Sequence, residues 1–275
     1  MEAVESVLNQ SYPYIKLYII EDGSADFSVY WKKLKNHPDI HYIRLNKNQG
    51  VSFCRNLGTD IGSSPYIAFL DSDDLWDSEK LAKQIEYMEL NPFLEWSHTN
   101  ETWKRNGELI QQKKQHKMEG GSIITKLMER CLISPSTVLF KRAFFSKHGK
   151  FLNHFRIAED YELWLRLNIH FPIGHLNSPL STKRAGTWSQ LSSTLEIDRY
   201  RVLALHRFYR LYKNDPAFLQ IEQQWREIIL KKINILIKGG TKYSSKYLKK
   251  YYCWKTVFEI SRTTEKRTDS SGTLR

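Results

Sequence analysis

Three aspartates lie close together directly after a short apolar run. Asp71, Asp73 and Asp74 follow residues 66–70, whose apolar side chains are typical of a buried strand. Carboxylates at the end of such a strand repel one another and lose hydration, and a bound cation offsets that cost. Because these ligands are all oxygen atoms, Asp71 and Asp73 favour Mg²⁺ or Mn²⁺, which also bind diphosphates. The alternative is an acidic turn that caps a helix beginning near Asp77.

Strands and helices alternate around these carboxylates. Apolar and helical patterns predict strands at residues 15–20, 40–45 and 66–70, and helices at residues 2–10, 27–36 and 51–61. This order predicts an α/β fold with a mostly parallel sheet that is flanked by helices on both faces. Ligands bind such sheets at the carboxyl ends of the strands. The acidic turns at residues 21–22 and 71–74 both follow strands, so we expect them to converge on one crevice.

The segments that follow continue as a mixture of helices and strands. A long helix is expected to run from residue 77 to about Asn91, where Pro92 stops it. Asn106 and Gly107 predict a hairpin turn. A later strand is expected at residues 133–140 and an amphipathic helix at residues 160–170.

The charge divides the chain into two regions. From residue 196 onward there are 18 Lys and Arg against 8 Asp and Glu, a net charge of +10. Residues 1–195 carry 24 against 22, a net charge of only +2. We therefore expect a nearly neutral domain at residues 1–195 and a basic helical region at residues 196–275, disordered from about residue 265.

Composition excludes several classes of protein. With 275 residues, 41% of them hydrophobic and 13% aromatic, the chain has the composition of a globular protein. No apolar run is long enough to span a membrane, and residues 1–5 lack the features of a secretory signal. Three widely spaced cysteines predict neither a disulfide nor a metal framework, and they fit a reducing cytoplasm.

Five segments resemble, in the same order, the motifs of family 2 glycosyltransferases. They are residues 10–12 (QSY), 19–24 (IIEDGS), 50–58 (GVSFCRNLG), 66–76 (YIAFLDSDDLW) and 158–166 (AEDYELWLR). The similarity covers roughly residues 2–192. It implies the GT-A fold, a Rossmann-like nucleotide-diphospho-sugar transferase domain.

The resemblance also implies a reaction. A sugar would move, with inversion, from a nucleotide diphosphate sugar such as a UDP-sugar to an acceptor hydroxyl. A divalent ion, Mn²⁺ or Mg²⁺, held by Asp71 and Asp73 would neutralise the departing diphosphate. Asp160 matches the family's catalytic base, and capping of the helix that begins there is its alternative role. Hydrolysis of a glycoside would need two carboxylates beside the bond, whereas one base suffices here.

Donor binding is implied for four residues of these motifs: Asp22, Arg55, Asp71 and Ser72. Asp22 matches a residue that contacts the uracil or the ribose, and its alternative is an ordinary turn residue before Gly23. Arg55 lies in the segment near the diphosphate. We interpret Asn56 as a packing residue of its helix.

His98 we interpret as structural, and we leave it outside the expected site. Thr187 stands where relatives often carry a histidine, so a histidine ligand to the metal is not expected. Residues 223–226 (QQWR) lack the order of the QxxRW signature, which argues against a processive polymerase.

The beginning of the chain departs from the family pattern. A strand and a loop normally precede the helix at residues 2–10, whereas Met1 falls inside that helix. Either the true start lies upstream or the gene product is truncated. The alternative function is therefore an inactive, truncated glycosyltransferase-like protein that binds a nucleotide sugar or a partner.

The expected partners are the sugar donor and a glycan or lipid-linked acceptor of bacterial surface glycan biosynthesis. The basic C-terminal region has three interpretations: a solvated helical face, contact with an anionic membrane, or nucleic-acid binding. Residues 242–255 interleave five lysines with Tyr and Trp, which suits a membrane surface. No nucleic-acid motif is present, so nucleic acid ranks last. The expected location is cytoplasmic, or peripheral at the inner face of the membrane.

Overall fold

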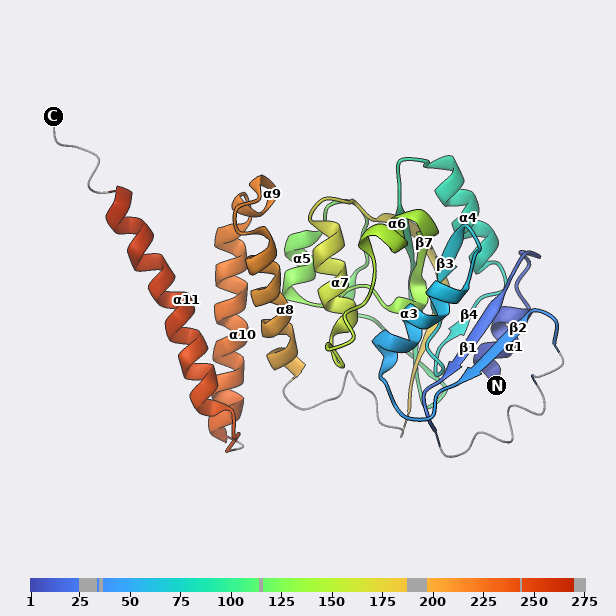
Figure 1. Cartoon of the computed structure of the whole chain (residues 1–275), viewed down its shortest axis with the longest axis horizontal. Coiled ribbons are helices and arrows are strands. Elements are labelled where there is room, and N and C mark those ends of the chain that lie inside the picture. Colours follow the sequence, from blue (N-terminus) through green and yellow to red (C-terminus); the bar gives the residue numbers. More distant parts are fainter. Residues whose placement is uncertain (25–33, 35–36, 114–115, 187–196, 243, 270–275) are drawn as a thin grey trace. The chain divides into compact units, whose positions relative to one another are not determined.

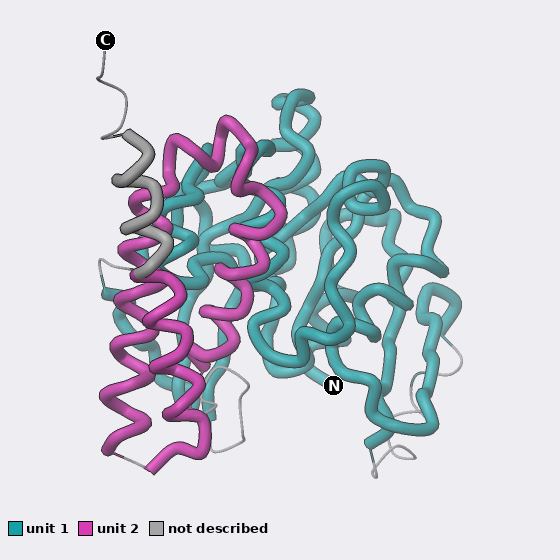
Figure 2. Tube along the Cα trace, turned by 60° about the vertical axis from the view of Figure 1, so that its left-hand side comes forward, with its two compact units in different colours: residues 1–190 teal, residues 191–275 magenta. Residues whose placement is uncertain are grey.

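The computed structural model describes residues 1–24, 34, 37–113, 116–186, 197–242 and 244–269 (Figure 1). The chain forms two compact units, residues 1–190 and residues 191–275 (Figure 2). The domain boundary predicted at residues 195 and 196 falls outside the described residues. So does nearly all of the helix predicted at residues 27–36.

The first unit contains helices and strands in alternation. In chain order its elements are α1 (Glu2–Leu8), β1 (Leu17–Glu21), β2 (Ile40–Arg44), α3 (Val51–Ile61), β3 (Tyr66–Ala68), β4 (Leu75–Trp76), α4 (Lys80–Leu90), β5 (Trp96–Arg105), β6 (Glu108–Ile110), α5 (Ile124–Glu129), the 3₁₀ turn η2 (Pro135–Thr137), β7 (Val138–Lys141), α6 (Arg142–His148), α7 (Glu159–Asn168) and β8 (Gly174–Ala185). The strands predicted near residues 15–20, 40–45 and 66–70 are thus confirmed as β1, β2 and β3. The strand predicted at residues 133–140 begins later, at Val138, because Pro135 starts η2.

The sheets are mixed, and the expectation of a mostly parallel sheet is wrong. Strands β1 and β2 form a separate parallel pair. The larger sheet has the order β3-β7-β5-β8-β4, with β6 also paired to β5. Only β5 and β8 are parallel in it, and its other four pairings are antiparallel. Parallel neighbours need a long crossover, whereas β5 and β6 are joined directly by the predicted turn at Asn106 and Gly107.

Helices α4 and α7 cover opposite faces of the larger sheet. Trp96 of β5 stacks on Trp164 of α7, with ring centroids 5.5 Å apart, and both side chains are fully buried. The next residue of the strand, Ser97, accepts a hydrogen bond from Gln84 of α4 at 3.1 Å. Successive strand residues point to opposite faces, so the sheet is a central layer between helices.

The second unit consists of helices. They are α8 (Ile197–Tyr212), α9 (Pro216–Leu219), α10 (Glu222–Lys242) and α11 (Leu248–Asp269). Trp225 lies at the centre, 1% exposed, stacked on Tyr209 and donating from Nε1 to the carbonyl of Leu205 at 2.9 Å. Helix α11 includes residues 265–269, where the sequence predicts disorder. Within the described parts of the chain, no helix has the length and apolar character that a membrane crossing requires.

Candidate active site

The loop after β3 is held closed by hydrogen bonds. The Asp74 N–H donates to the Asp71 carbonyl at 3.0 Å. Ser136, from η2, accepts a hydrogen bond from the Asp71 N–H at 3.1 Å and donates to Asp74 Oδ2 at 2.7 Å. A residue 65 positions away therefore fixes the backbone from which Asp71 projects.

Asp74 has a structural position in this loop. It is 2% exposed, and its Oδ1 accepts a bond from the backbone N–H of Arg184 in β8 at 3.1 Å. Burial raises the pKa of Asp74 to about 7. The helix-capping alternative is wrong for this loop, because the N-cap residue of α4 is Glu79 and the first-turn N–H of Leu81 donates to the Gln10 side chain at 3.0 Å.

The carboxylates of Asp71 and Asp73 remain at the surface of the loop. Asp71 is 36% exposed, Asp73 is half-buried and Ser72 is exposed. Among the described residues, no three His, Cys, Asp or Glu side chains gather as metal ligands. A site of one or two carboxylates that is completed by substrate phosphates is nevertheless the usual one for Mg²⁺. The residues therefore fit a divalent ion that binds together with a diphosphate. Thr187 lies outside the described residues.

Arg55 connects this loop to helix α7. Its side chain is 9% exposed and lies over the ring of Phe151, 5.1 Å from the centroid. Nη2 donates to Asp71 Oδ1 and Nη1 donates to Glu159 Oε1, each at 2.7 Å. The diphosphate contact predicted for Arg55 stays a prediction, and the observed partners of the guanidinium are these two carboxylates.

Glu159 is a residue of the site that the sequence reasoning missed. It is 5% exposed, and burial followed by the charge of Asp160 raises its pKa to about 7, against the opposing effect of Arg55. Its position directly before Asp160 was the signal available in the sequence. Two adjacent acids at the start of a helix cannot both be at the surface if one pairs with a buried arginine.

Asp160 lies in the first turn of α7. The N-cap residue is Ala158, which has left-handed backbone angles (φ 60°, ψ 30°), so the alternative of Asp160 as the N-cap is wrong. Asp160 is half-buried. Its Oδ1 accepts from the Tyr161 N–H at 2.7 Å, and its Oδ2 accepts from the Cys131 thiol at 3.4 Å. Non-glycine residues with such angles cost energy and cluster at functional sites.

Asp22 joins the loop after β1 to the start of α3. Its Oδ1 accepts from the Gln49 N–H at 2.6 Å, and its Oδ2 accepts from the Gly50 N–H at 2.8 Å. These bonds reach residues 27 and 28 positions away, so Asp22 does more than an ordinary turn residue before Gly23. The nucleotide contact of Asp22 stays a prediction. Helix α3 therefore contacts Asp22 at its N-terminal end. Farther along the same helix, Arg55 binds Asp71.

Lys183 is a second residue that the sequence reasoning left out of the site. Its ammonium group donates to Ser134 Oγ at 3.0 Å. Burial alone would lower the pKa of Lys183, but the charges of Glu101, Asp74 and Asp71 outweigh burial and raise it. A half-buried cation thus interacts electrostatically with the acidic loop.

His98 and Asn56 have structural positions, as the sequence indicated. His98 is fully buried, its Nε2 lies 2.9 Å from the carbonyl oxygen of Glu119, and burial lowers its pKa to about 3. Asn56 donates to the carbonyl of Phe151 and accepts from the N–H of the same residue. Neither side chain takes part in the Asp71–Arg55–Glu159 network.

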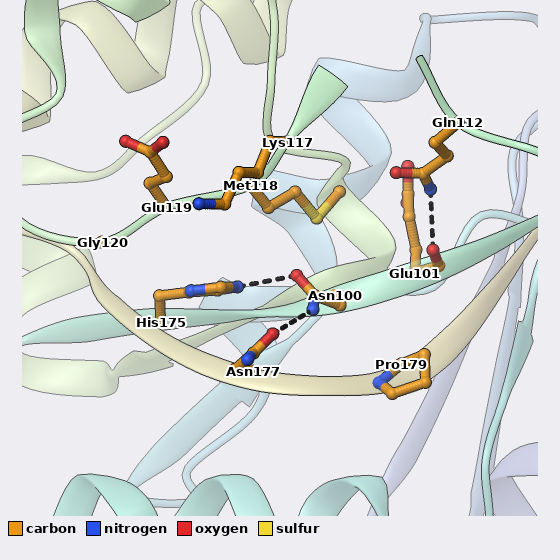
Figure 3. A pocket seen from close by; sticks show the side chains of 10 residues that line it. All are labelled: Asn100, Glu101, Gln112, Lys117, Met118, Glu119, Gly120, His175, Asn177 and Pro179. Atoms are coloured by element: carbon orange, nitrogen blue, oxygen red, sulfur yellow. Dashed lines mark hydrogen bonds between the residues drawn. The ribbon is translucent and has the colours of Figure 1, made fainter. Parts of the chain in front are cut away.

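A polar pocket of about 480 Å³ lies between β5, β8 and residues 117–120 (Figure 3). On its floor, Asn100 accepts a bond from His175 and donates to Asn177. Glu101 lines this pocket, and its charge raises the pKa of Lys183. Its Oε1 accepts from Trp103, while its Oε2 is buried without a partner in the described structure.

Comparison with known proteins gives several relatives. An uncharacterized glycosyltransferase of Rickettsia bellii is 34% identical over 186 residues, which are 67% of this chain and 26% of that protein. The Escherichia coli UDP-Glc:alpha-D-GlcNAc-diphosphoundecaprenol beta-1,3-glucosyltransferase WfaP is 30% identical over 178 residues, 60% of this chain and 62% of that enzyme. The chain spans 26% to 30% of the length of three Rickettsia relatives.

The structural comparison and the family model point to the same kind of protein. The crystal structure of S. aureus TarS 1–349 in complex with UDP-GlcNAc matches with a TM-score of 0.61 at 16% identity, covering 100% of this chain and 88% of that one. The family model described as Glycosyl transferase family 2 matches residues 1–149, more than half of the sequence. This chain therefore belongs to glycosyl transferase family 2.

Proposed function

We propose that the chain transfers a sugar from a UDP-sugar to an acceptor hydroxyl, with inversion at the anomeric carbon. The observation that carries the proposal is the bridge through Arg55. It ties the loop of Asp71, where a diphosphate and its cation would bind, to the first turn of α7, where Asp160 lies. The expected site of the leaving group and the expected base are thereby held in fixed positions relative to each other, as an in-line displacement requires.

On this proposal Asp160 accepts the proton of the acceptor hydroxyl while the new carbon–oxygen bond forms. The bond from the anomeric carbon to the diphosphate breaks in the same step, and UDP leaves with the electron pair. Asp71 and Asp73 would hold a Mn²⁺ or Mg²⁺ ion, which supplies charge neutralisation for the diphosphate when bound. Lys183 adds a fixed positive charge beside the acidic loop.

For the donor, we propose that Asp22, Arg55, Asp71 and Ser72 surround the nucleotide and its diphosphate. The choice of UDP is supported by the printed donor of WfaP and by the ligand in the TarS complex. Asp22 orders the turn that begins α3, and Arg55 orders the loop that carries Asp71 and Ser72. Asp22 and Arg55 would then help to bind the donor in part indirectly, by fixing the backbone of these two loops.

For the acceptor, we propose the pocket of Figure 3. Its amide, carboxylate and ammonium groups suit the hydroxyls of a sugar, and the charge of Glu101 in its lining also raises the pKa of Lys183. WfaP acts on a sugar linked through diphosphate to undecaprenol. A lipid-linked or surface glycan acceptor is the corresponding proposal here. The three cysteines are free, which fits action in the reducing cytoplasm.

The decisive experiment compares the unmodified chain with Asp160→Asn. Removal of a general base should slow transfer by about 10²–10⁴-fold or more and leave UDP affinity unchanged. Transfer is followed by chromatography of products from UDP-sugars and a lipid-linked sugar acceptor, and UDP binding by calorimetry. Normal turnover by Asp160→Asn would assign the base to another residue.

Two further outcomes separate the alternatives. If the unmodified chain binds UDP but transfers no sugar from any UDP-sugar tested, the alternative function of an inactive binding protein is favoured. The metal role predicts tighter UDP binding with Mn²⁺ than without it, and loss of that difference in Asp73→Ala. Equal affinity of the unmodified chain in both conditions would refute the metal role.

A further inference from the structure

The α10–α11 hairpin is a strongly basic part of the molecule. Between Glu227 and Glu259, residues 228–258 contain eight lysines and no Asp, Glu or Arg. The two helices contact each other, and Phe258 of α11 lies against Trp225 of α10, with ring centroids 5.7 Å apart. Without neutralising acids of its own, this segment has a local excess of eight positive charges.

Most of these lysines are available to a partner. The exposed ones that form no ion pair with any described carboxylate are Lys231, Lys238, Lys246, Lys249 and Lys250. Lys232 differs, because it is 6% exposed and lies 3.5 Å from Asp198 of α8. Lys255 lies 3.8 Å from Glu259. Of the eight lysines, Lys232 and Lys255 thus pair with carboxylates, and the five named above are exposed, although Lys246 and Lys250 also lie over the rings of Tyr247 and Trp254.

Apolar side chains lie on the same helical faces as these lysines. Ile235, 50% exposed, stands one turn from both Lys231 and Lys238. On α11, Tyr252, also 50% exposed, follows Lys249 by three residues. Cations that alternate with exposed aliphatic and aromatic groups are typical of helices that lie in a membrane interface.

We propose that the α10–α11 hairpin docks on an anionic phospholipid bilayer. The lysines would contact lipid phosphates, and Ile235, Tyr252 and Val257 would enter the head-group layer. The positive charge of the lysines complements the negative charge of the lipid phosphates, which favours a bilayer over other partners. A second copy of the hairpin would be repelled, and nucleic-acid sites favour arginine, which residues 228–258 lack. The proposal is independent of sugar transfer, although docking would bring unit 1 to lipid-linked acceptors.

The test measures binding of the full chain to vesicles by cosedimentation. We expect binding to phosphatidylcholine vesicles that contain about one third phosphatidylglycerol, weakening as salt is raised, and much weaker binding to pure phosphatidylcholine. A lysine near an anionic surface contributes about fivefold in affinity. The triple variant Lys238→Gln, Lys249→Gln, Lys250→Gln should therefore bind about 10²-fold less tightly.

A matched control removes the same charge elsewhere. Lys113→Gln, Lys147→Gln, Lys213→Gln changes three exposed lysines outside the hairpin and should retain most of the binding. Circular dichroism checks that both triple variants are folded. Equal losses in the two triple variants would show that only net charge matters and would overturn the proposal. Binding to RNA but not to anionic vesicles would overturn it as well.

Discussion

At the scale of single residues, the site depends on one buried cation that two carboxylates share. Arg55 has a planar guanidinium that can donate to Asp71 and Glu159 from different nitrogens, a geometry that lysine cannot reproduce. Glu159 is 5% exposed, so its charge is costly without this partner. The arginine therefore opposes the effects of burial and of Asp160 on the pKa of Glu159, and it ties down the residue directly before Asp160.

We predict that Arg55→Met lowers the free energy of unfolding by about 3–5 kcal/mol, because removing one partner leaves Glu159 buried and uncompensated. Urea unfolding followed by circular dichroism measures this. The control is Lys150→Met, which breaks the Lys150–Asp60 pair, whose side chains are about half exposed. Such surface pairs contribute about 0–1 kcal/mol. If the two variants lost equal stability, the Arg55 bridge would not stabilise the fold as we describe.

Much of the site could be predicted from residue types and spacing, but not the burial of individual acids. The run of residues 71–74 indicates a cluster of carboxylates near a strand end. It does not distinguish the buried Asp74 from the more exposed Asp71, since the difference arises from Ser136 and Arg184, far away in the chain. Glu159 was missed for the same reason: its partner Arg55 is 104 positions distant.

At the scale of elements, the loop after β3 is positioned by η2 and β8. The Ser136 hydroxyl connects η2 to this loop, because it accepts a hydrogen bond from the Asp71 backbone N–H and donates one to the Asp74 carboxylate. The Asp74 carboxylate in turn accepts from the β8 backbone. The conformation of the loop therefore depends on η2 and β8 as well as on its own residues, and it forms only when the sheet is assembled.

Ser136→Ala should weaken UDP binding in the presence of Mn²⁺ by about five- to tenfold, because a lost hydrogen bond of about 1 kcal/mol loosens the loop. Titration calorimetry gives the affinity. Ser181→Ala is the matched control, since its buried hydroxyl donates to the carbonyl of Ser136 and has no bond to Asp71 or Asp74. The same UDP affinity in both variants would show that the Ser136 hydroxyl does not position the loop.

Element identity was more predictable than strand direction. Apolar runs and turn residues located β1, β2, β3 and the hairpin at Asn106 and Gly107, because these depend on local patterns. The direction of pairing depends on which strands meet in space. Strand β5 lies between β7 and β8, with opposite directions of pairing on its two sides, and no local pattern encodes that.

At the scale of the whole molecule, the chain forms two compact units with separate cores. Trp96, Phe140 and Trp164 stack in the first unit, whereas Trp225 and Tyr209 stack in the second. The residues of the proposed reaction all belong to the first unit, and the basic hairpin belongs to the second. Catalysis and attachment are therefore expected to respond to different mutations.

We predict that Trp225→Ala destabilises the second unit by about 3–5 kcal/mol, through a cavity and the loss of the bond to Leu205, and leaves UDP affinity unchanged. Thermal unfolding by far-UV circular dichroism should show an early partial loss of helix, and calorimetry with UDP and Mn²⁺ should match the unmodified chain. Trp96→Ala, an equally buried tryptophan of the first unit, should instead abolish UDP binding. If Trp225→Ala weakened UDP binding as strongly as Trp96→Ala, the two units would have to fold as one cooperative body, and the separation of catalysis from attachment would fail.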